Sequence, residues 1–271
     1  MSEELLTFWE HLDALRSVLF KTVIVVVVVM IVVFCFKTTM FNILLAPCHA
    51  DFITYRLLDA LAAKFHFLSF STGDETVLTS TSLVSTELTS QFLIHMKISA
   101  YSALMVASPY VGYQLFRFIS PALYASERKY VRWVLVASFF FFFMGVLLSY
   151  FVIFPFSFRF LSNYQVDHTV TNLFTLNSYM GTLVMLTMLM GVMFEIPVIA
   201  WLLALLGLLK AAPLRKYRRH AIVAILIIAA IITPTTDIFT LLLVSLPILL
   251  LYELSILIVS RVCNRKKQAE A

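Results

Sequence analysis

Charged residues are scarce in this chain. Asp, Glu, Lys and Arg make up 13% of its 271 residues, whereas hydrophobic residues make up 61%. Such a composition argues against a soluble fold of this size, because whole segments lack the polar side chains needed for a solvated face. The apolar runs are long and continuous, unlike the alternating strands of a transmembrane barrel. We therefore expect an all-α polytopic membrane protein.

The residues and motifs of common active sites are also missing. The three cysteines, Cys35, Cys48 and Cys263, lack the paired spacing of a disulfide framework or zinc site. A contact between Cys35 and Cys48 near the outer surface is the less favoured alternative. The sequence has no HExxH, no GxSxG and no Gly-rich phosphate loop, and its six histidines are scattered. We expect no cofactor, no metal and no catalytic residue.

Six apolar stretches are candidates for transmembrane helices, which need roughly 20 residues each. In one domain of residues 1–271, they cover about 17–36, 91–116, 131–154, 176–206, 217–232 and 239–259. The last two are short. They are separated by TPTTD, which predicts a tight hairpin because Pro234 stops a helix and Asp237 can cap the next one. Residues 37–90 form a long outer loop, in which DFITYRLLDALAAKFHF has the apolar spacing of an amphipathic surface helix.

The positions of Lys and Arg predict the orientation. With both termini and the loops around Arg128 and Arg218 on one side, that side collects fifteen of the 20 basic residues and is therefore cytoplasmic. The basic clusters adjoin apolar stretches, where membrane orientation and anionic lipid explain them, so we do not expect nucleic-acid binding.

Two stretches place acids on the predicted cytoplasmic side. In FWEHLDALRSVLF, Glu10, Asp13 and Arg16 share one helical face. They are either a solvated face of an amphipathic helix or an acidic patch for a cationic partner. Glu127 follows the second stretch in SPYVGYQLFRFISPALYASERKY, where it is either paired with its basic neighbours or available for binding. In the same segment Pro109 is expected to kink or end a helix, and Pro121 to begin a turn.

The sequence MFEIPV places an acid at membrane depth. A charged group there costs about 2.5–3.5 kcal/mol on insertion scales, which favours a functional reason for Glu195 over a merely hydrogen-bonded one. Pro197 removes a backbone donor, and such a break is tolerated only against protein or a wet cavity. We expect Glu195 to face a polar concavity. Asp237 and Glu253 bracket the last stretch, and Glu253 is either an interface acid or a binding residue.

Together these segments resemble the TatC family, the multi-spanning subunit of the twin-arginine protein translocase. The resemblance covers Phe8 to about Arg261. It rests on HLDALR, YQLFRFISPALYASER, FEIPV, ITPTTD and LPILLLYE, in that order.

The resemblance implies a non-enzymatic receptor in the bacterial cytoplasmic membrane. It would bind the twin-arginine signal peptides of folded cargo through Glu127 and the N-terminal acids Glu10 and Asp13, beside Arg16. Export of the cargo would be driven by the proton gradient, and the receptor would form a homo-oligomer within the receptor complex. Arg–carboxylate pairs are bidentate and directional, which suits this task. Where the family usually has Glu, this chain has Ala14, and Asp13 and Glu10 are the nearest acids.

The resemblance also implies that the single-span partners TatA and TatB dock near Thr233 and Asp237, and that Glu195 faces a concave membrane-embedded surface. Thr236 stands where the family usually has Pro, and Leu241 where it usually has Gln. Two other hypotheses remain open from the residues. One is a proton-coupled secondary transporter that uses Glu195, and the other is an intramembrane enzyme that uses Glu195 and Asp237.

Overall fold

The computed structural model describes residues 8–49, 51–57, 83–119, 128–164, 167, 172–233 and 237–270. Most of these residues are helical, and Val84 and Thr175 form an isolated parallel bridge. The elements are α1 (Phe8–Cys35), α2 (Lys37–Leu45), η1 (Ala46–Cys48), α5 (Ser90–Ile119), α6 (Arg128–Leu148), η3 (Ser149–Ile153), α7 (Phe154–Asn163), α8 (Leu176–Met193), α9 (Ile196–Leu205), α10 (Ala211–Lys216), α11 (Arg218–Ile232) and α12 (Ile238–Glu270).

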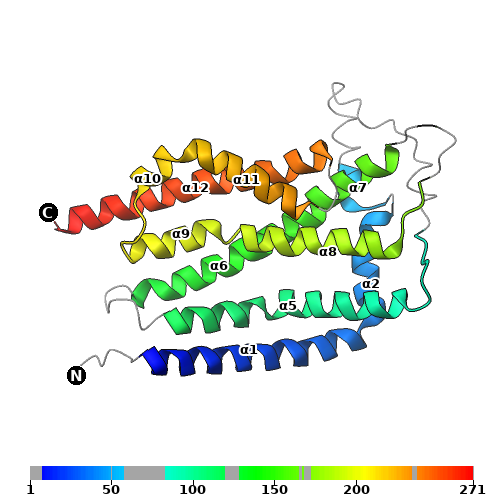
Figure 1. Ribbon diagram of the computed structural model, residues 1–271, viewed down its shortest axis with the longest axis horizontal. Coiled ribbons are helices and arrows are strands. Elements are labelled where there is room, and N and C mark those ends of the chain that lie inside the picture. Colours follow the sequence, from blue (N-terminus) through cyan, green and yellow to red (C-terminus); the bar gives the residue numbers. More distant parts are fainter. Residues whose placement is uncertain are drawn as a thin grey trace.

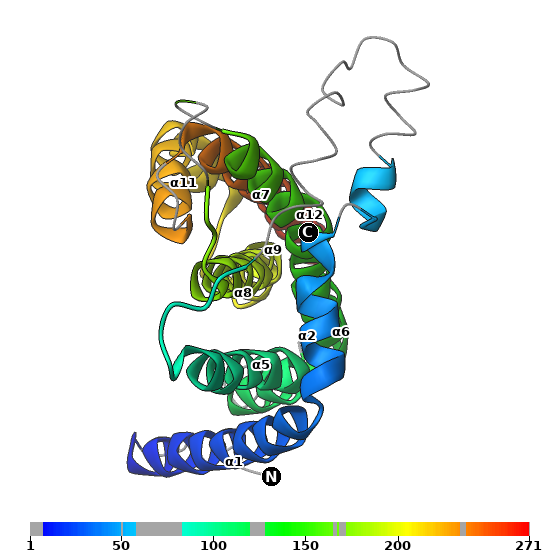
Figure 2. The ribbon, with the colours of Figure 1, turned by 90° about the vertical axis from the view of Figure 1, so that its right-hand side faces the viewer.

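The long helices lie side by side along the longest axis of the molecule (Figure 1). Both chain termini are at one end of the bundle, which we call the terminal end, together with α10. The helices α2 and α7 lie at the opposite end. Figure 2, which looks along the bundle, shows a bowed arrangement with α1 and α11 at its two extremities. Termini at the same end agree with an even number of crossings.

Each of the six predicted stretches contains a helix. Within the described residues, four helical segments are long and apolar enough to cross a membrane: Leu12–Cys35, Arg132–Asn163, Leu176–Leu205 and Ile238–Arg265. Of the other two, α5 is long but more polar, and α11 has 15 residues and measures only about 22 Å. The polytopic helical fold is thus confirmed, while the number of crossings stays a prediction.

The third helical segment extends further than its apolar stretch indicated. The sequence predicts an end near Phe154, yet η3 and α7 continue the helical path of α6 to Asn163. Pro155 lies in the first turn of α7, where its missing N–H is tolerated. The carbonyl four residues earlier, that of Phe151, instead accepts a hydrogen bond from Thr54 Oγ1. A side chain from the segment that follows η1 thereby compensates for the proline.

Helix α8 forms the centre of the core. Leu186 and Met190 are completely buried, and α8 packs against α5, α6 and α11. By contrast, the apolar side chains of α1, such as Leu19 and Ile31, are largely exposed, as expected for a helix that faces lipid. Helices in a bilayer associate through close packing rather than through water exclusion, and α8 supplies much of that packing.

Tyrosine hydroxyls anchor the segment around η1 at the end of the bundle opposite the terminal end. Tyr55 donates to the carbonyls of Pro47 (3.1 Å) and Pro155 (3.3 Å), and Tyr179 donates to that of Leu44 (3.0 Å). Burial raises the pKa of the Tyr55 hydroxyl above its ordinary value, so this group remains a donor at neutral and moderately alkaline pH. Tyr55 is therefore held against α7, and the end of α2 against α8.

The structure describes only part of the expected amphipathic helix in the outer loop. Residues 53–57 are helical, and Tyr55, the one described residue of the predicted apolar face, is 2% exposed and buried against protein. The remainder of the predicted helix, from Leu58 on, lies outside the described residues. All three cysteines are free thiols, so Cys35 and Cys48 do not form a disulfide.

Replacing Tyr55 with Phe is expected to destabilise the protein by about 1 kcal/mol, because Pro47 and Pro155 lose a buried hydrogen-bond donor. Thermal unfolding in detergent measures the effect. Tyr101→Phe is the matched control, since Tyr101 is 38% exposed and should tolerate the change. Equal unfolding temperatures for the two variants would contradict the anchoring role.

Candidate functional site

Glu195 lies at the break between α8 and α9. Helix α8 ends at Met193, α9 begins at Ile196, and Glu195 precedes its first turn. The carboxyl is only partly buried, and its Oε1 accepts a hydrogen bond of 2.7 Å from Ser138 Oγ on α6. The acid found in the sequence therefore has a specific polar partner within the bundle.

Pro197 explains why the helix is interrupted at this point. It lies in the first turn of α9 and has no N–H to donate to the carbonyl of Met193. The backbone N–H groups of Val198 and Ile199 donate to the carbonyl of Glu195, at 3.0 and 2.9 Å. The Glu195 side chain makes no capping bond to α9, which leaves it for contacts with other helices.

Close packing of α6 on α8 brings Ser138 to Glu195. A Cβ built on Gly145 of α6 would lie 2.6 Å from the Met190 carbonyl oxygen, and one on Gly191 of α8 would lie 2.9 Å from the Phe142 ring. Only glycine allows these approaches. Gly145 is two turns from Ser138, and Gly191 is one turn from Glu195, so both glycines set the register of the hydrogen-bonded pair.

Helix α5 contributes the third wall of this site. A Cβ on Gly112 would lie 4.0 Å from Ser138 Oγ, an ordinary contact distance. Pro109 is inside α5, which continues to Ile119, so this proline does not end the helix. Ser108 Oγ donates to the carbonyl of Met105 at 2.7 Å, which is the carbonyl that Pro109 leaves without its usual donor.

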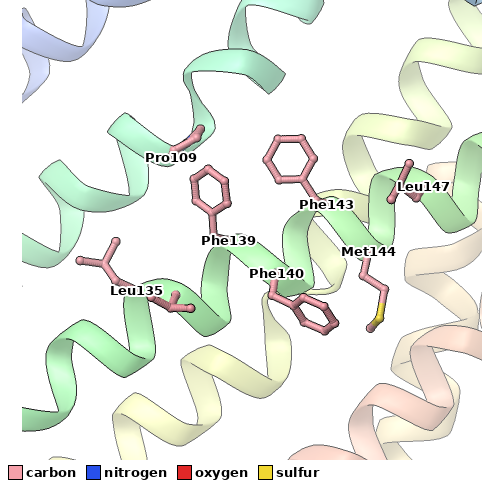
Figure 3. A pocket seen from close by; sticks show the side chains of 8 residues that line it. Pro109, Leu135, Phe139, Phe140, Phe143, Met144 and Leu147 are labelled. Atoms are coloured by element: carbon pink, nitrogen blue, oxygen red, sulfur yellow. The ribbon is translucent and has the colours of Figure 1, made fainter.

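An open apolar groove runs along α6 beside Pro109, with a volume of about 750 Å³ (Figure 3). Its lining residues are Pro109, Leu135, Val136, Phe139, Phe140, Phe143, Met144 and Leu147. Several of these side chains are substantially exposed, as on a lipid-facing helix. All eight side chains that line the groove are apolar. The groove is therefore not the polar concavity that the sequence predicts around Glu195.

Replacing Ser138 with Ala removes the only hydrogen bond to the Glu195 carboxyl among those described, and should destabilise the protein by about 0.5–1.5 kcal/mol, the contribution of a typical hydrogen bond. Thermal unfolding in detergent measures this. Ser138→Thr keeps the hydroxyl and should retain more stability. Ser255→Ala is the control, because it removes a buried hydroxyl that bonds only to the Leu251 carbonyl. If Ala and Thr at position 138 behave alike, the hydrogen bond is irrelevant.

The N-terminal candidates lie in the first turns of α1, at the terminal end. Asp13 and Arg16 are exposed, and the Arg16 guanidinium lies 5.6 Å from the centre of the Phe20 ring. Neither residue belongs to the two ion pairs found among the described side chains. Glu10 belongs to α1, but its side chain lies outside the described part. Glu127 and Pro121 lie outside the described residues altogether.

The hairpin before α12 has the expected cap. Asp237 accepts a 2.6 Å hydrogen bond from the backbone N–H of Thr240, which confirms that Asp237 caps this helix. Thr233 is buried and donates to the carbonyl of Ala229 at 3.0 Å. Pro234 lies outside the described residues. Glu253, which the sequence places at the end of the last apolar stretch, lies inside α12 and pairs with Arg218 at 2.6 Å.

Comparison with known families identifies the chain. The family model for the Sec-independent protein translocase protein (TatC) matches residues 10–247. This chain belongs to the TatC family. TatC is a component of a protein translocase and not an enzyme, which removes the hypothesis of an intramembrane enzyme. Among the described residues, no group of three or more His, Cys, Asp or Glu is placed to hold a metal ion.

Individual TatC proteins match over most of their length. The chain is 33% identical to TatC of Blattabacterium over 265 residues, which covers 96% of this chain and 97% of that protein. It is 36% identical to TatCy of Bacillus subtilis over 181 residues, or 67% of this chain and 70% of that protein. A crystal structure of the twin-arginine translocase receptor TatC superposes with a TM-score of 0.74 at 28% identity, covering 93% of this chain and 99% of the other.

Sequence reasoning singled out Glu195 of this TatC chain but missed its hydrogen-bond partner. Ser138 lies between an alanine and a run of phenylalanines, and no local pattern distinguishes it from other serines in apolar helices. Gly145 and Gly191 offered a better signal, because isolated glycines in helical stretches often mark close packing in membranes. Pairing them across α6 and α8 would have pointed to the contact.

Proposed function

We propose that this chain is the receptor subunit of a twin-arginine translocase in the bacterial cytoplasmic membrane. It binds the twin-arginine signal peptides of folded cargo at its cytoplasmic face and recruits TatA and TatB for export driven by the proton gradient. The observation that carries the proposal is the likeness, over 93% of the chain, to a solved TatC described as the twin-arginine translocase receptor.

The arrangement of the terminal end supports this proposal. Glu10 and Asp13 are one turn apart in α1, and the ends of α5 and α6 that flank the segment with Glu127 lie at the same end of the bundle (Figure 1). Carboxylates from two segments can each bind one guanidinium of an arginine pair in a bidentate manner. A lysine pair carries the same charge but lacks this fork geometry.

We further propose that residues 1–271 form one transmembrane domain with six crossings and cytoplasmic termini. In this arrangement Glu195 provides a polar site at membrane depth, and the hairpin around Thr233 and Asp237 is the docking region for the TatA and TatB helices. Buried acids in transmembrane helices are retained at a cost, which supports a functional rather than an incidental Glu195. A homo-oligomer within the receptor complex completes the proposal.

Binding of a fluorescent signal peptide to the purified chain in lipid nanodiscs tests the function. A peptide with two consecutive arginines should bind clearly more tightly than the same peptide with two lysines. In cells that lack their own TatC, expression of this chain with matching TatA and TatB should restore export of a twin-arginine reporter. Equal affinity for the arginine and lysine peptides would refute the receptor function.

A further inference from the structure

A second charged surface lies at the terminal end, formed by α10 and the first turn of α11. We call residues 210–219 the cationic elbow. Its exposed basic side chains are Lys210, Arg215, Lys216, Arg218 and Arg219, and α12 adds Arg261 and Arg265 nearby. Among the described side chains of these segments the only carboxylate is Glu253. Because Glu253 is already paired with Arg218 at 2.6 Å, the other cations have no further carboxylate among the described side chains of these segments to neutralise them.

The elbow is held rigidly against α12. Tyr252 donates to the carbonyl of Leu214 at 2.9 Å, and Arg215 donates to Ser260 Oγ at 3.2 Å. The Cys263 thiol lies 3.8 Å from the carbonyl of Leu209, at the start of the elbow. The positive charges of α10, α11 and α12 are thus carried by helices that contact one another. Such preorganisation lowers the entropic cost of binding an anion.

An apolar stripe continues from the cations along α11. Arg219, Val223, Ile227 and Ile231 are spaced by four residues, so they share one helical face. All four are exposed, with 57% exposure at Val223 and Ile227 and 69% at Ile231. Tyr217, which is 53% exposed, stands among the cations, with Lys216 Nζ 5.9 Å from the centre of its ring. Tyrosine is a residue type enriched at membrane interfaces.

We propose that the cationic elbow binds an anionic phospholipid, with the headgroup phosphate on Arg215, Lys216 and Arg219 and an acyl chain along Val223 and Ile227. A ligand with a charged head and a long apolar tail matches both halves of this surface. A nucleic acid or an acidic protein segment would cover the cations and leave the stripe exposed. The inference is independent of the proposed receptor function, because it concerns a different set of residues.

Native mass spectrometry of the full chain in detergent tests the proposal with phosphatidylglycerol and zwitterionic phosphatidylcholine as probes. The wild type should retain phosphatidylglycerol in preference to phosphatidylcholine. Each cation removed is expected to lower the affinity roughly fivefold, so the triple variant R215Q/K216Q/R219Q should lose on the order of a hundredfold. The matched control is K21Q/R117Q/R132Q, which removes three exposed charges from other helices.

Two further measurements distinguish specific lipid binding at the cationic elbow from nonspecific electrostatic attraction. Excess inorganic phosphate should not displace the lipid, because it lacks the apolar tail. Val223→Asn with Ile227→Asn should weaken lipid retention while leaving all the cations in place. Equal losses in the triple variant and its control, or full displacement by phosphate, would overturn the proposal. Retention of the wild-type amount of phosphatidylglycerol by the triple variant would overturn it as well.

Discussion

Glu127→Gln is expected to weaken binding of a twin-arginine peptide by roughly tenfold or more. A hydrogen bond to a charged group contributes about 1.5–3 kcal/mol, and each 1.4 kcal/mol changes an affinity tenfold. Glutamine keeps the size of the side chain and removes its charge, so the change acts on the guanidinium contact and little on packing. Fluorescence anisotropy of a labelled signal peptide with nanodisc-embedded protein measures the affinity.

The N-terminal acids should share this contact. The triple variant E10Q/D13N/E127Q is expected to lose all discrimination between arginine and lysine peptides, because no carboxylate of the proposed site is left to recognise the guanidinium fork. Glu253→Gln is the matched control, since it removes an acid that pairs with Arg218 in a different part of the terminal end. Undiminished discrimination in the triple variant would place the binding site elsewhere.

Gly145→Ala should be strongly destabilising although it adds a single methyl group. That methyl would lie 2.6 Å from the Met190 carbonyl oxygen and 2.8 Å from the Phe194 ring. Backbone cannot rotate away as a side chain can, so α6 and α8 must separate, at a cost of about 1–3 kcal/mol. For a chain of this size each kcal/mol lowers the unfolding temperature by about 2–4 °C, which a thermal-shift assay detects.

Gly181→Ala on α8 is the control for this change. A Cβ at position 181 would have nothing within 4 Å, and alanine is the better helix former, so no loss of stability is expected. Gly145→Ala should also reduce export, because separation of α6 from α8 moves Ser138 away from Glu195. An unfolding temperature equal to that of Gly181→Ala would show that the two helices can adjust without cost.

The helices were predictable from the sequence because their apolar runs are long, and lipid leaves few alternatives to a helix. The break at Glu195–Pro197 was also predictable, since proline removes a backbone donor at a fixed position. The continuation of α6 through Pro155 was not. It depends on Thr54, a residue of the outer loop about a hundred positions earlier in the chain.

The site was only half predictable for a related reason. An acid in an apolar run is conspicuous in the sequence, whereas its hydrogen-bond donor is an ordinary serine on another helix. The register of α6 on α8 decides which serine faces Glu195, and this register depends on two glycine contacts that are visible only in three dimensions. The polar partner therefore could not be inferred from local patterns.

The shortness of α11 has an electrical consequence. Its 15 residues measure about 22 Å, whereas a typical hydrocarbon core is about 30 Å thick. If the bilayer adapts to this helix, the membrane voltage falls over a shorter distance beside it, and the local field is steeper by roughly a third. A charged group that moves along α11 would then gain its electrical work over a shorter path than elsewhere in the bundle.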